Sequence, residues 1–249
     1  MVKSNQITST KGKNDMAKLL TIGGGEFTRR EIDKIDKYAL DMTGKSAPRA
    51  LYIPTASNDE EMDLYDEYFK GFGVELDKLA LIANNPSKEE IEEKFDRADY
   101  VFAGGGDALL LMKVWKEYGV DAIVRRLYHH TEKVFSGISA GSICYYEIGH
   151  TDSLSYHYEN WDYCRMHGTG LIPAIHSPHY NPHRHESLMR WVADEVLPGV
   201  GLDNCCALAC DNGVYSVVTS SPEARCHVIR NTKNGVIEEL YGDGEIITL

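Results

Sequence analysis

The order of apolar and polar positions predicts strands that alternate with helices from residue 17 onward. Short apolar runs are typical of buried strands, and the longer amphipathic stretches between them are typical of helices. The expected strands lie within residues 17–25, 49–57, 78–84, 98–106 and 133–139, and the expected helices within 29–44, 62–73, 87–97 and 108–130.

Strands joined by helical crossovers pair in parallel. We therefore expect an α/β fold, a three-layer structure with a mostly parallel sheet and helices on both faces. The runs at 213–220, 225–231 and 235–242 are short and alternating, and they predict antiparallel strands near the C-terminus. Residues 1–16 are polar and show no periodic pattern, so we expect a flexible leader followed by a single domain over residues 17–249.

The amino-acid composition argues against some classes of binding partner. With 26 Lys and Arg against 38 Asp and Glu, the net charge is -12, which repels nucleic acid and anionic membrane surfaces. No apolar run reaches the roughly 18–20 residues that span a bilayer, and the N-terminus lacks the apolar centre of a secretory signal. We expect a soluble cytoplasmic protein. Its 6 cysteines show no C-x-x-C spacing, which favours reduced thiols over a zinc ribbon or a disulfide framework.

The most informative motif is Gly137-x-Ser139-x-Gly141, which follows an apolar strand and precedes a run of helical character. This order is typical of a nucleophile elbow, where a strained turn pushes a serine hydroxyl out of the sheet edge. The N–H of Ala140 would then face the space where an oxyanion forms. A second donor is expected from the glycine-rich loop at Gly105 or Gly106. The other triple-glycine loop, residues 23–25, is more simply read as a tight strand-to-helix turn.

A serine nucleophile needs a histidine base and a group that orients it. Residues 174–187 contain four candidates for the base: His176, His179, His183 and His185. Because Pro178 and Pro182 are expected to break any helix here, no helical pair of histidine ligands forms, and we expect no metal site. Two acids stand out, Asp152 and Asp211. The second also fits a plain Asp-Asn-Gly turn between strands.

Taken in order, the motifs LTIGGGEF, YIPTAS, VFAGGGDALLL, FSGISAGSICYYE, SPHYNP and CDNGVYSV resemble the peptidase E family of serine peptidases, from about residue 17 to 241. This family includes the α-aspartyl dipeptidases and, more distantly, cyanophycinase. The resemblance implies a fold related to the class I glutamine amidotransferases. It also implies that Ser139 is the nucleophile, that His179 is the base, and that Asp211 is the acid, with Asp152 as the alternative.

One departure from the family bears on specificity. Related aspartyl dipeptidases carry an arginine in a Gly-Glu-Thr-Arg stretch after the catalytic histidine, thought to hold the aspartate side chain of the substrate. The matching residues here end in Leu188, which cannot bind a carboxylate, so we expect no strict preference for an N-terminal aspartate. Arg184 and Arg190 are the side chains that remain for such a pocket. The aromatic segment 156–163 is expected to form a loop over the site.

The leading hypothesis is a serine peptidase with dipeptidase-like or exopeptidase activity on short peptides, requiring no cofactor. A catalytically silent binding protein with the same fold is the first alternative, and an esterase that uses the same triad is the second. The expected partner is a short peptide substrate. The sequence does not determine the oligomeric state, and a homodimer is our working hypothesis for the assembly.

Overall fold

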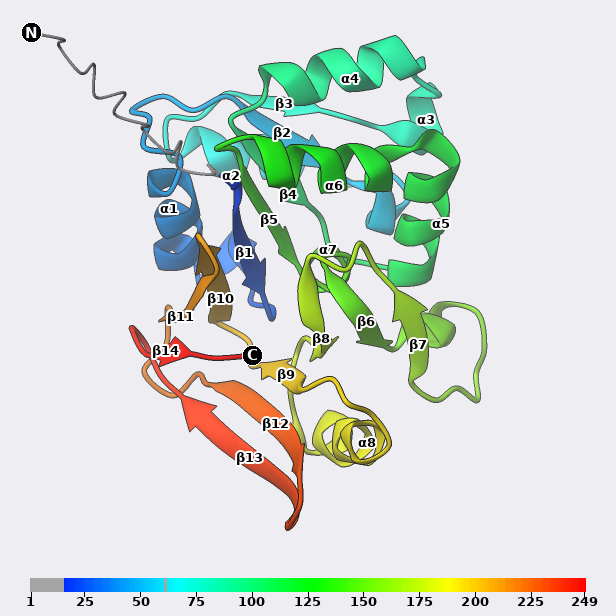
Figure 1. Cartoon of the computed structure of the whole chain (residues 1–249). Coiled ribbons are helices and arrows are strands. Elements are labelled where there is room, and N and C mark those ends of the chain that lie inside the picture. Colours follow the sequence, from blue (N-terminus) through cyan, green and yellow to red (C-terminus); the bar gives the residue numbers. More distant parts are fainter. Residues whose placement is uncertain (1–15, 61) are drawn as a thin grey trace, which may run out of the picture.

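The computed structural model describes residues 16–60 and 62–249. The flexible leader expected at residues 1–16 therefore lies, apart from Met16, outside the described residues, and the division into leader and domain stays a prediction. The described part contains two β-sheets and helices on both sides of the larger one (Figure 1).

The first sheet has 8 strands in the order β14-β11-β10-β1-β5-β4-β2-β3. Its centre is parallel, from β1 through β5, β4 and β2 to β3, and β10 joins β1 antiparallel. This confirms the mostly parallel sheet and the antiparallel strands near the C-terminus. The strands are β1 (Lys18–Ile22), β2 (Ala50–Ile53), β3 (Leu76–Lys78), β4 (Tyr100–Ala103), β5 (Val134–Ile138), β10 (Cys206–Asp211), β11 (Val214–Thr219) and β14 (Ile246–Ile247).

Side chains alternate between the two faces of this sheet, so each face carries its own core. Leu19 packs in one cluster with α4, α5 and α6, while Leu20 packs in another with α1 and α2. Because both faces are covered, the central strands read as continuous apolar runs. The α-helices are α1 (Asp33–Asp41), α2 (Met62–Lys70), α3 (Leu81–Asn84), α4 (Lys88–Arg97), α5 (Ala108–Tyr118), α6 (Val120–His130), α7 (Ala140–Ile143) and α8 (Pro182–Ala193), with 3-10 turns η1 (Phe27–Arg29), η2 (Thr55–Ser57) and η3 (Ser153–Tyr156).

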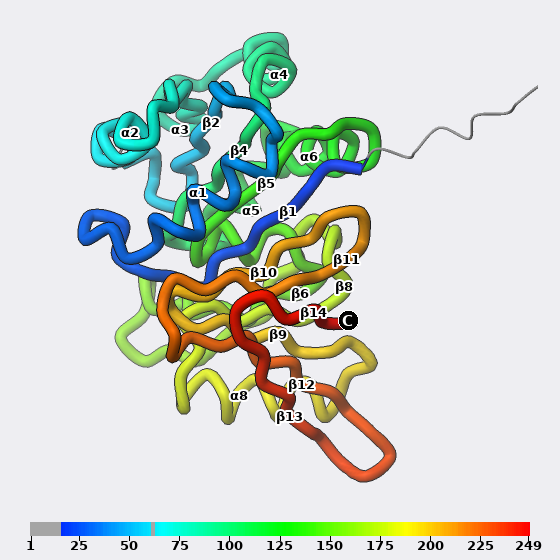
Figure 2. Tube along the Cα trace, turned by 90° about the vertical axis from the view of Figure 1, so that its left-hand side faces the viewer, coloured from blue at the N-terminus to red at the C-terminus, as the bar shows by residue number. Residues whose placement is uncertain are grey.

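The second sheet, of 6 strands in the order β13-β12-β9-β8-β6-β7, is a feature that the sequence pattern did not predict. Its inner face joins the larger core cluster, and α8 covers its outer face through Leu188 and Val192. Figures 1 and 2 show this sheet and α8 at the end of the molecule opposite α4. Its strands are β6 (Tyr146–Thr151), β7 (Cys164–His167), β8 (Ile172–Ser177), β9 (Gly199–Leu202), β12 (Cys226–Thr232) and β13 (Gly235–Tyr241).

Three local expectations were wrong. The strand expected within residues 78–84 ends at Lys78, and Leu81–Asn84 forms a helical turn instead. The single helix expected over 108–130 is divided at Gly119, which adopts a left-handed conformation with φ 73°. Pro182 does not break a helix but begins α8, because proline at the first position loses no helical hydrogen bond and Asn181 caps the end.

The carboxyl ends of β1, β2, β4 and β5 meet at one edge of the first sheet, where their loops are tied together by backbone hydrogen bonds. The N–H of Ser139 donates to the carbonyl of Ile22 (3.0 Å), and that of Asp107 donates to the carbonyl of Ala56 (2.8 Å). Ligands bind at this edge in open α/β sheets. The glycine-rich loops and the elbow motif are therefore brought to one place by the topology.

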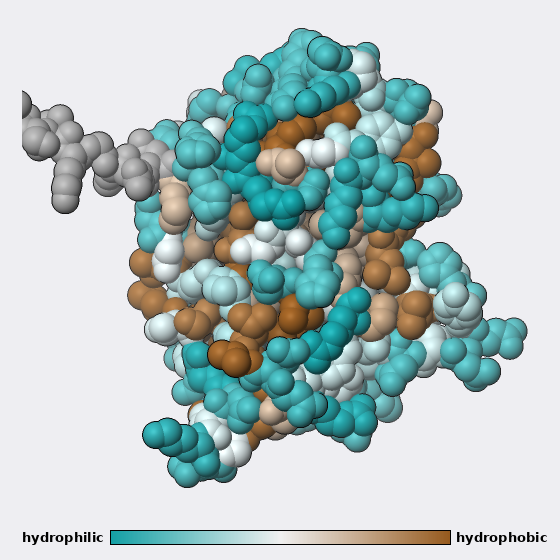
Figure 3. Space-filling model, turned by 45° about the vertical axis from the view of Figure 1, so that its right-hand side comes forward, coloured by the Kyte–Doolittle hydropathy of each residue, from teal (hydrophilic) through white to brown (hydrophobic). Residues whose placement is uncertain are grey.

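The surface seen in Figure 3 carries separate hydrophobic patches with hydrophilic residues between them. This face does not present one continuous apolar surface, and the homodimer stays a prediction. Within residues 16–60 and 62–249, no helix combines the length and the apolar character needed to cross a membrane.

Candidate active site

Ser139 lies at the turn between β5 and α7, with φ 55° and ψ -118°. A residue other than glycine avoids this region, so the backbone is strained in the way a nucleophile elbow requires. The turn also depends on Gly141, because a Cβ there would lie 2.1 Å from the carbonyl oxygen of Ala103. The backbone of Ser139 therefore has the strained conformation that the sequence motif predicted.

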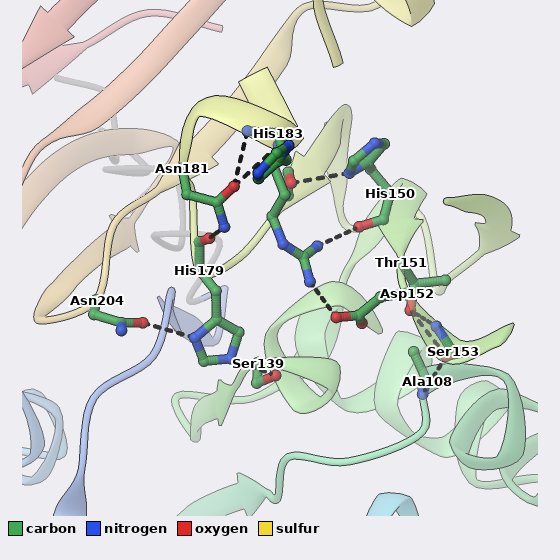
Figure 4. Close-up of polar contacts among 12 residues, drawn as sticks. Ala108, Ser139, His150, Thr151, Asp152, Ser153, His179, Asn181, His183 and Asn204 are labelled. Atoms are coloured by element: carbon green, nitrogen blue, oxygen red, sulfur yellow. Dashed lines mark hydrogen bonds and ion pairs between the residues drawn. The ribbon is translucent and has the colours of Figure 1, made fainter. Parts of the chain in front are cut away.

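The hydroxyl of Ser139 meets His179, which follows β8 of the second sheet. Oγ lies 2.9 Å from Nε2 of the imidazole (Figure 4). His179 also has a positive φ, 47°, and its N–H donates to the carbonyl of Gly23 (2.9 Å). Burial lowers the pKa of His179 below its ordinary value, the hydrogen bond with Asn204 opposes this, and the positive charge of Arg184 adds to the lowering. The neutral form that can accept a proton is therefore favoured.

The third group is Asn204, in the loop after β9. Nδ1–H of His179 donates to Oδ1 of Asn204 (2.6 Å), which leaves Nε2 as the acceptor for the serine hydroxyl. An asparagine orients the histidine in some cysteine peptidases as well. Sequence reasoning missed Asn204 because it searched for a carboxylate, and an asparagine after an apolar run is an ordinary turn signal.

The expectation that Asp211 completes the triad needs correction. Asp211 ends β10, which runs antiparallel to β1, and its neighbour Cys210 pairs with Leu19 at the start of β1. Its carboxylate lies 3.7 Å from Nζ of Lys18, at the edge of the sheet opposite Ser139. The two residues that follow, Asn212 and Gly213, have positive φ values of 51° and 78°. The plain Asp-Asn-Gly turn between strands is therefore the right interpretation.

Asp152, the alternative acid, lies on the same side of the molecule as His179 but binds Arg184 instead. Nη2 of Arg184 donates to Oδ2 of Asp152 (2.5 Å), and the guanidinium stacks 5.0 Å from the ring centre of Tyr163. The arginine side chain is only 4 % exposed. Arg184 is thus committed to an internal ion pair, and a substrate carboxylate would have to displace Asp152 to reach it.

Neither of the other specificity residues faces the site. Leu188 is fully buried in the cluster beneath α8. Arg190 is exposed on that helix and lines neither of the two cavities beside Ser139. The comparison of motifs aligned Leu188 with an arginine that binds substrate. That alignment is wrong, because the side chain of Leu188 lies in the core.

The remaining histidines of the cluster have separate environments. His176 is fully buried, stacks on Tyr146, and lies 2.9 Å through Nε2 from Oγ of Ser142; burial lowers its pKa to about 3. His185 contacts the hydroxyl of Tyr180 (2.9 Å). His183 is exposed and lies away from Ser139 (Figure 4). Of the four, His179 alone contacts the elbow serine among the described residues.

Gly24 has a role that the sequence interpretation understated. A Cβ at this position would lie 2.3 Å from both Nδ1 of His179 and Oδ1 of Asn204. Glycine here therefore makes room for the hydrogen bond between the imidazole and the amide, in addition to permitting a turn. The loop after β1 is part of the site.

Gly105 and Gly106 border Ser139 from the loop after β4. A Cβ on Gly105 would lie 3.3 Å from Cβ of Ser139, so this loop and the elbow are in direct contact. Within residues 16–60 and 62–249, the N–H groups of Gly105, Gly106 and Ala140 donate no backbone hydrogen bond outside the regular helices and strands. These N–H groups are available as donors beside the serine hydroxyl.

Two cavities flank the Ser139–His179 pair. One, of about 520 Å³, is lined by Gly105, Gly106 and the loop residues Ala56, Ser57, Asn58, Glu60, Asp107, Leu110, Tyr156 and His157. The other, of about 330 Å³, is lined by His179 and Asn204 together with Gly25, Glu26, Arg29 and Glu31. Part of the aromatic segment 156–163 thus borders the first cavity, as expected. Among the described residues, no three His, Cys, Asp or Glu side chains are grouped to hold a metal ion.

A serine on a strained strand-to-helix turn, hydrogen-bonded to a histidine at the edge of a mostly parallel sheet, is the arrangement of serine hydrolases with an α/β fold. Residues 19–218 match the model of peptidase family S51. The chain therefore belongs to this family of serine peptidases, and the resemblance to peptidase E is confirmed.

Individual relatives agree with this assignment. The chain is 25% identical over 228 residues to the uncharacterized peptidase YgaJ of Bacillus subtilis (strain 168), a match that covers 90% of this chain and 96% of the relative. Two solved structures share the fold. A peptidase from an acI-B1 Actinobacterium has a TM-score of 0.67 at 18% identity, covering 95% of this chain and 98% of that one. A Listeria monocytogenes EGD-e protein assigned to peptidase E has a TM-score of 0.61 at 20% identity, with coverage of 83% and 100%.

The position of Asn204 can be tested directly. We expect Asn204→Ala to lower kcat/KM for a peptide substrate by about 10–100-fold, because it removes a hydrogen bond of about 1.5–3 kcal/mol that holds the imidazole. Asn204→Asp keeps an acceptor oxygen and should retain most of the activity. Asp211→Asn is the matched control, with less than a threefold change. An equal loss in the Asp211 and Asn204→Ala variants would contradict the assignment.

Proposed function

We propose that this chain cleaves short peptides through an acyl-enzyme, with Ser139 as nucleophile, His179 as general base and acid, and Asn204 as the group that orients the imidazole. The observation that carries the proposal is the continuous hydrogen-bonded chain from Oγ of Ser139 through both ring nitrogens of His179 to Oδ1 of Asn204. Its geometry prepares the neutral tautomer that general-base catalysis needs.

The reaction follows from this geometry. Oγ attacks the peptide carbonyl carbon while its proton passes to Nε2 of His179, and the N–H groups of Ala140 and Gly105 or Gly106 bind the oxyanion. When the C–N bond breaks, the imidazolium returns the proton to the leaving nitrogen. A water molecule then attacks the acyl ester and gives up a proton to Nε2. The imidazolium returns this proton to Oγ as the ester C–O bond breaks, which regenerates the serine hydroxyl and releases the acid product.

The third group differs in charge from the usual aspartate. Asn204 is neutral, so it fixes the tautomer of His179 without stabilising the imidazolium by a full negative charge. Asp152 lies near enough to favour the charged form of His179, while Arg184 opposes it. These two residues form an ion pair, so their effects on the pKa of His179 have opposite directions.

An esterase uses the same steps and is the second candidate, since its acyl-enzyme chemistry is shared. Membership of a peptidase family favours peptides. The experiment is a comparison of X-Leu dipeptides, with X as Asp, Ala, Leu or Lys, against simple esters of the same acyl groups. Hydrolysis of esters alone would overturn the peptidase proposal.

The same panel tests specificity. We expect kcat/KM for Asp-Leu to exceed that for Ala-Leu by less than about a hundredfold, because Arg184 is already paired with Asp152 and no arginine is among the described residues that line the cavity beside Gly105 and Gly106. A larger ratio, equivalent to more than about 2.7 kcal/mol, would show that another residue binds the aspartate side chain. Arg184→Gln and Arg190→Gln would then identify which one.

A further inference from the structure

The two cavities beside Ser139 differ in their relation to the catalytic step. In acyl transfer the histidine delivers a proton to the leaving nitrogen, so the leaving residue must lie on the side of His179. The cavity of about 330 Å³ lies there, with His179 and Asn204 in its wall. In a peptide the leaving residue continues toward the C-terminus, and in a dipeptide it ends in a carboxylate. Whether the site can bind this carboxylate therefore depends on which side chain of the cavity can donate hydrogen bonds to an anion.

Three charged side chains line this cavity, and two of them are occupied within their own turn. Oε1 of Glu26 accepts hydrogen bonds from N–H (3.2 Å) and Oγ1 (2.8 Å) of Thr28. Oε2 of Glu31 accepts the N–H of Glu26 (2.9 Å). The backbone N–H of Arg29 donates to the carbonyl of Glu26 (3.2 Å), but its side chain makes no hydrogen bond or ion pair with any residue that the structure describes. The hydrogen bonds from Thr28 lower the pKa of Glu26, and the charge of Arg29 adds to this lowering. The guanidinium of Arg29 is the donor left available at the wall.

The neighbouring residue, Arg30, differs from Arg29 because its side chain is held by other residues of the chain. Nε of Arg30 donates to Oδ2 of Asp33 (2.8 Å), and its guanidinium lies over the rings of Tyr68 and Phe72. Arg30 does not line the cavity. The two adjacent arginines therefore differ in environment while sharing charge and size.

The opposite cavity has acidic side chains and no Lys or Arg among its described lining residues. Among its lining residues are the carboxylates of Glu60 and Asp107, the latter paired with His157 (2.9 Å). A negative wall fits the ammonium group at the N-terminus of a short peptide. Among the described residues that line the two cavities, Arg29 is the one Lys or Arg side chain, and it lies in the cavity of His179. Its position agrees with the direction that the chemistry requires, with the N-terminus of the peptide on the side of Gly105 and the C-terminus on the side of His179.

We propose that Arg29 binds the free C-terminal carboxylate of the leaving residue, which makes the site selective for peptides that end one residue beyond the scissile bond. This inference rests on the proposed function and adds the recognition of a free carboxyl terminus. Guanidinium and carboxylate form charge-assisted, bidentate hydrogen bonds, so the contact contributes to binding of the acid and not of the corresponding amide.

The test uses Ala-Leu and Ala-Leu amide with the wild-type chain, Arg29→Gln and the matched control Arg30→Gln. We expect the wild type to favour the acid by at least about tenfold in kcat/KM, through KM. Arg29→Gln should abolish this preference by slowing cleavage of the acid, with less than a threefold change for the amide. Arg30→Gln should keep the preference. Equal rates for acid and amide in the wild type, or an equal loss of both in Arg29→Gln, would overturn the proposal.

A binding measurement separates this inference from the proposed function. In the Ser139→Ala background, calorimetry should show at least about tenfold tighter binding of Ala-Leu than of its amide, and a second change, Arg29→Gln, should remove the difference. If the wild type cleaves neither compound but the binding difference is present, the peptidase proposal fails and the role of Arg29 stands. Peptide cleavage that depends on Ser139, with equal binding of both compounds, rejects Arg29 alone.

Discussion

Ser139→Ala is expected to lower kcat for peptide hydrolysis by about three or more orders of magnitude, the scale seen when a member of a catalytic triad is removed. The physical reason is that the hydroxyl of Ser139 lies at the strained turn and is hydrogen-bonded to Nε2 of His179, which can accept its proton. Because alanine removes only Oγ, the fold should be retained. The measurement is single-turnover hydrolysis of the best X-Leu dipeptide, alongside thermal unfolding.

Ser142 provides the matched control, since it also contacts a histidine. Its Oγ lies 2.9 Å from Nε2 of His176 and 2.6 Å from the carbonyl oxygen of Ser139. This pair is buried and cannot reach a substrate, so Ser142→Ala should cost less than about tenfold in kcat, through a looser elbow. Hydrolysis that persists unchanged in Ser139→Ala would end the assignment of the nucleophile.

The elbow was predictable because it is local. A strand, two glycines around a serine and the start of a helix lie within a few consecutive residues, and the backbone conformation of Ser139 follows from them. The parallel sheet was predictable for a similar reason, since each strand and its crossover helix are adjacent in sequence. The glycine loop at Gly105 and Gly106 could be placed beside the serine once the sheet order was assumed.

The third group of the site was not predictable in this way. Asn204 reaches His179 only because β8 and β9 are neighbours in a second sheet, and nothing in the alternation of apolar residues separates those strands from the first sheet. Asp211 attracted attention as an acid at a strand end, but strand direction decides which edge it occupies. The contact of Gly24 with the imidazole is likewise a property of the assembled site.

His179→Ala should cause a loss comparable to that of Ser139→Ala, because the serine hydroxyl then has no base and the leaving nitrogen no acid. The pH dependence carries separate information. Burial holds the pKa of His179 below 6.5, so the imidazole stays neutral until the pH falls below that value. We therefore expect kcat/KM of the wild type to fall on the acid side with an apparent pKa below 6.5. A profile whose acid limb lies above 6.5 would contradict the environment described for this histidine.

The other histidines of the segment serve as controls for His179, each for a different reason. His183→Ala and His185→Ala should each change kcat/KM by less than about threefold. The side chain of His183 is exposed, and that of His185 contacts the hydroxyl of Tyr180, so neither contacts Ser139. His176→Ala should lose stability and cost up to about tenfold in kcat/KM, since its imidazole bonds Ser142 behind the elbow and leaves a buried gap when removed. The ratio of kcat/KM between the His176 and His179 variants is thus the measurement that discriminates. A larger loss at His176 than at His179 would mean that the catalytic pair is the buried one, and that the contact between Ser139 and His179 is not the reacting geometry.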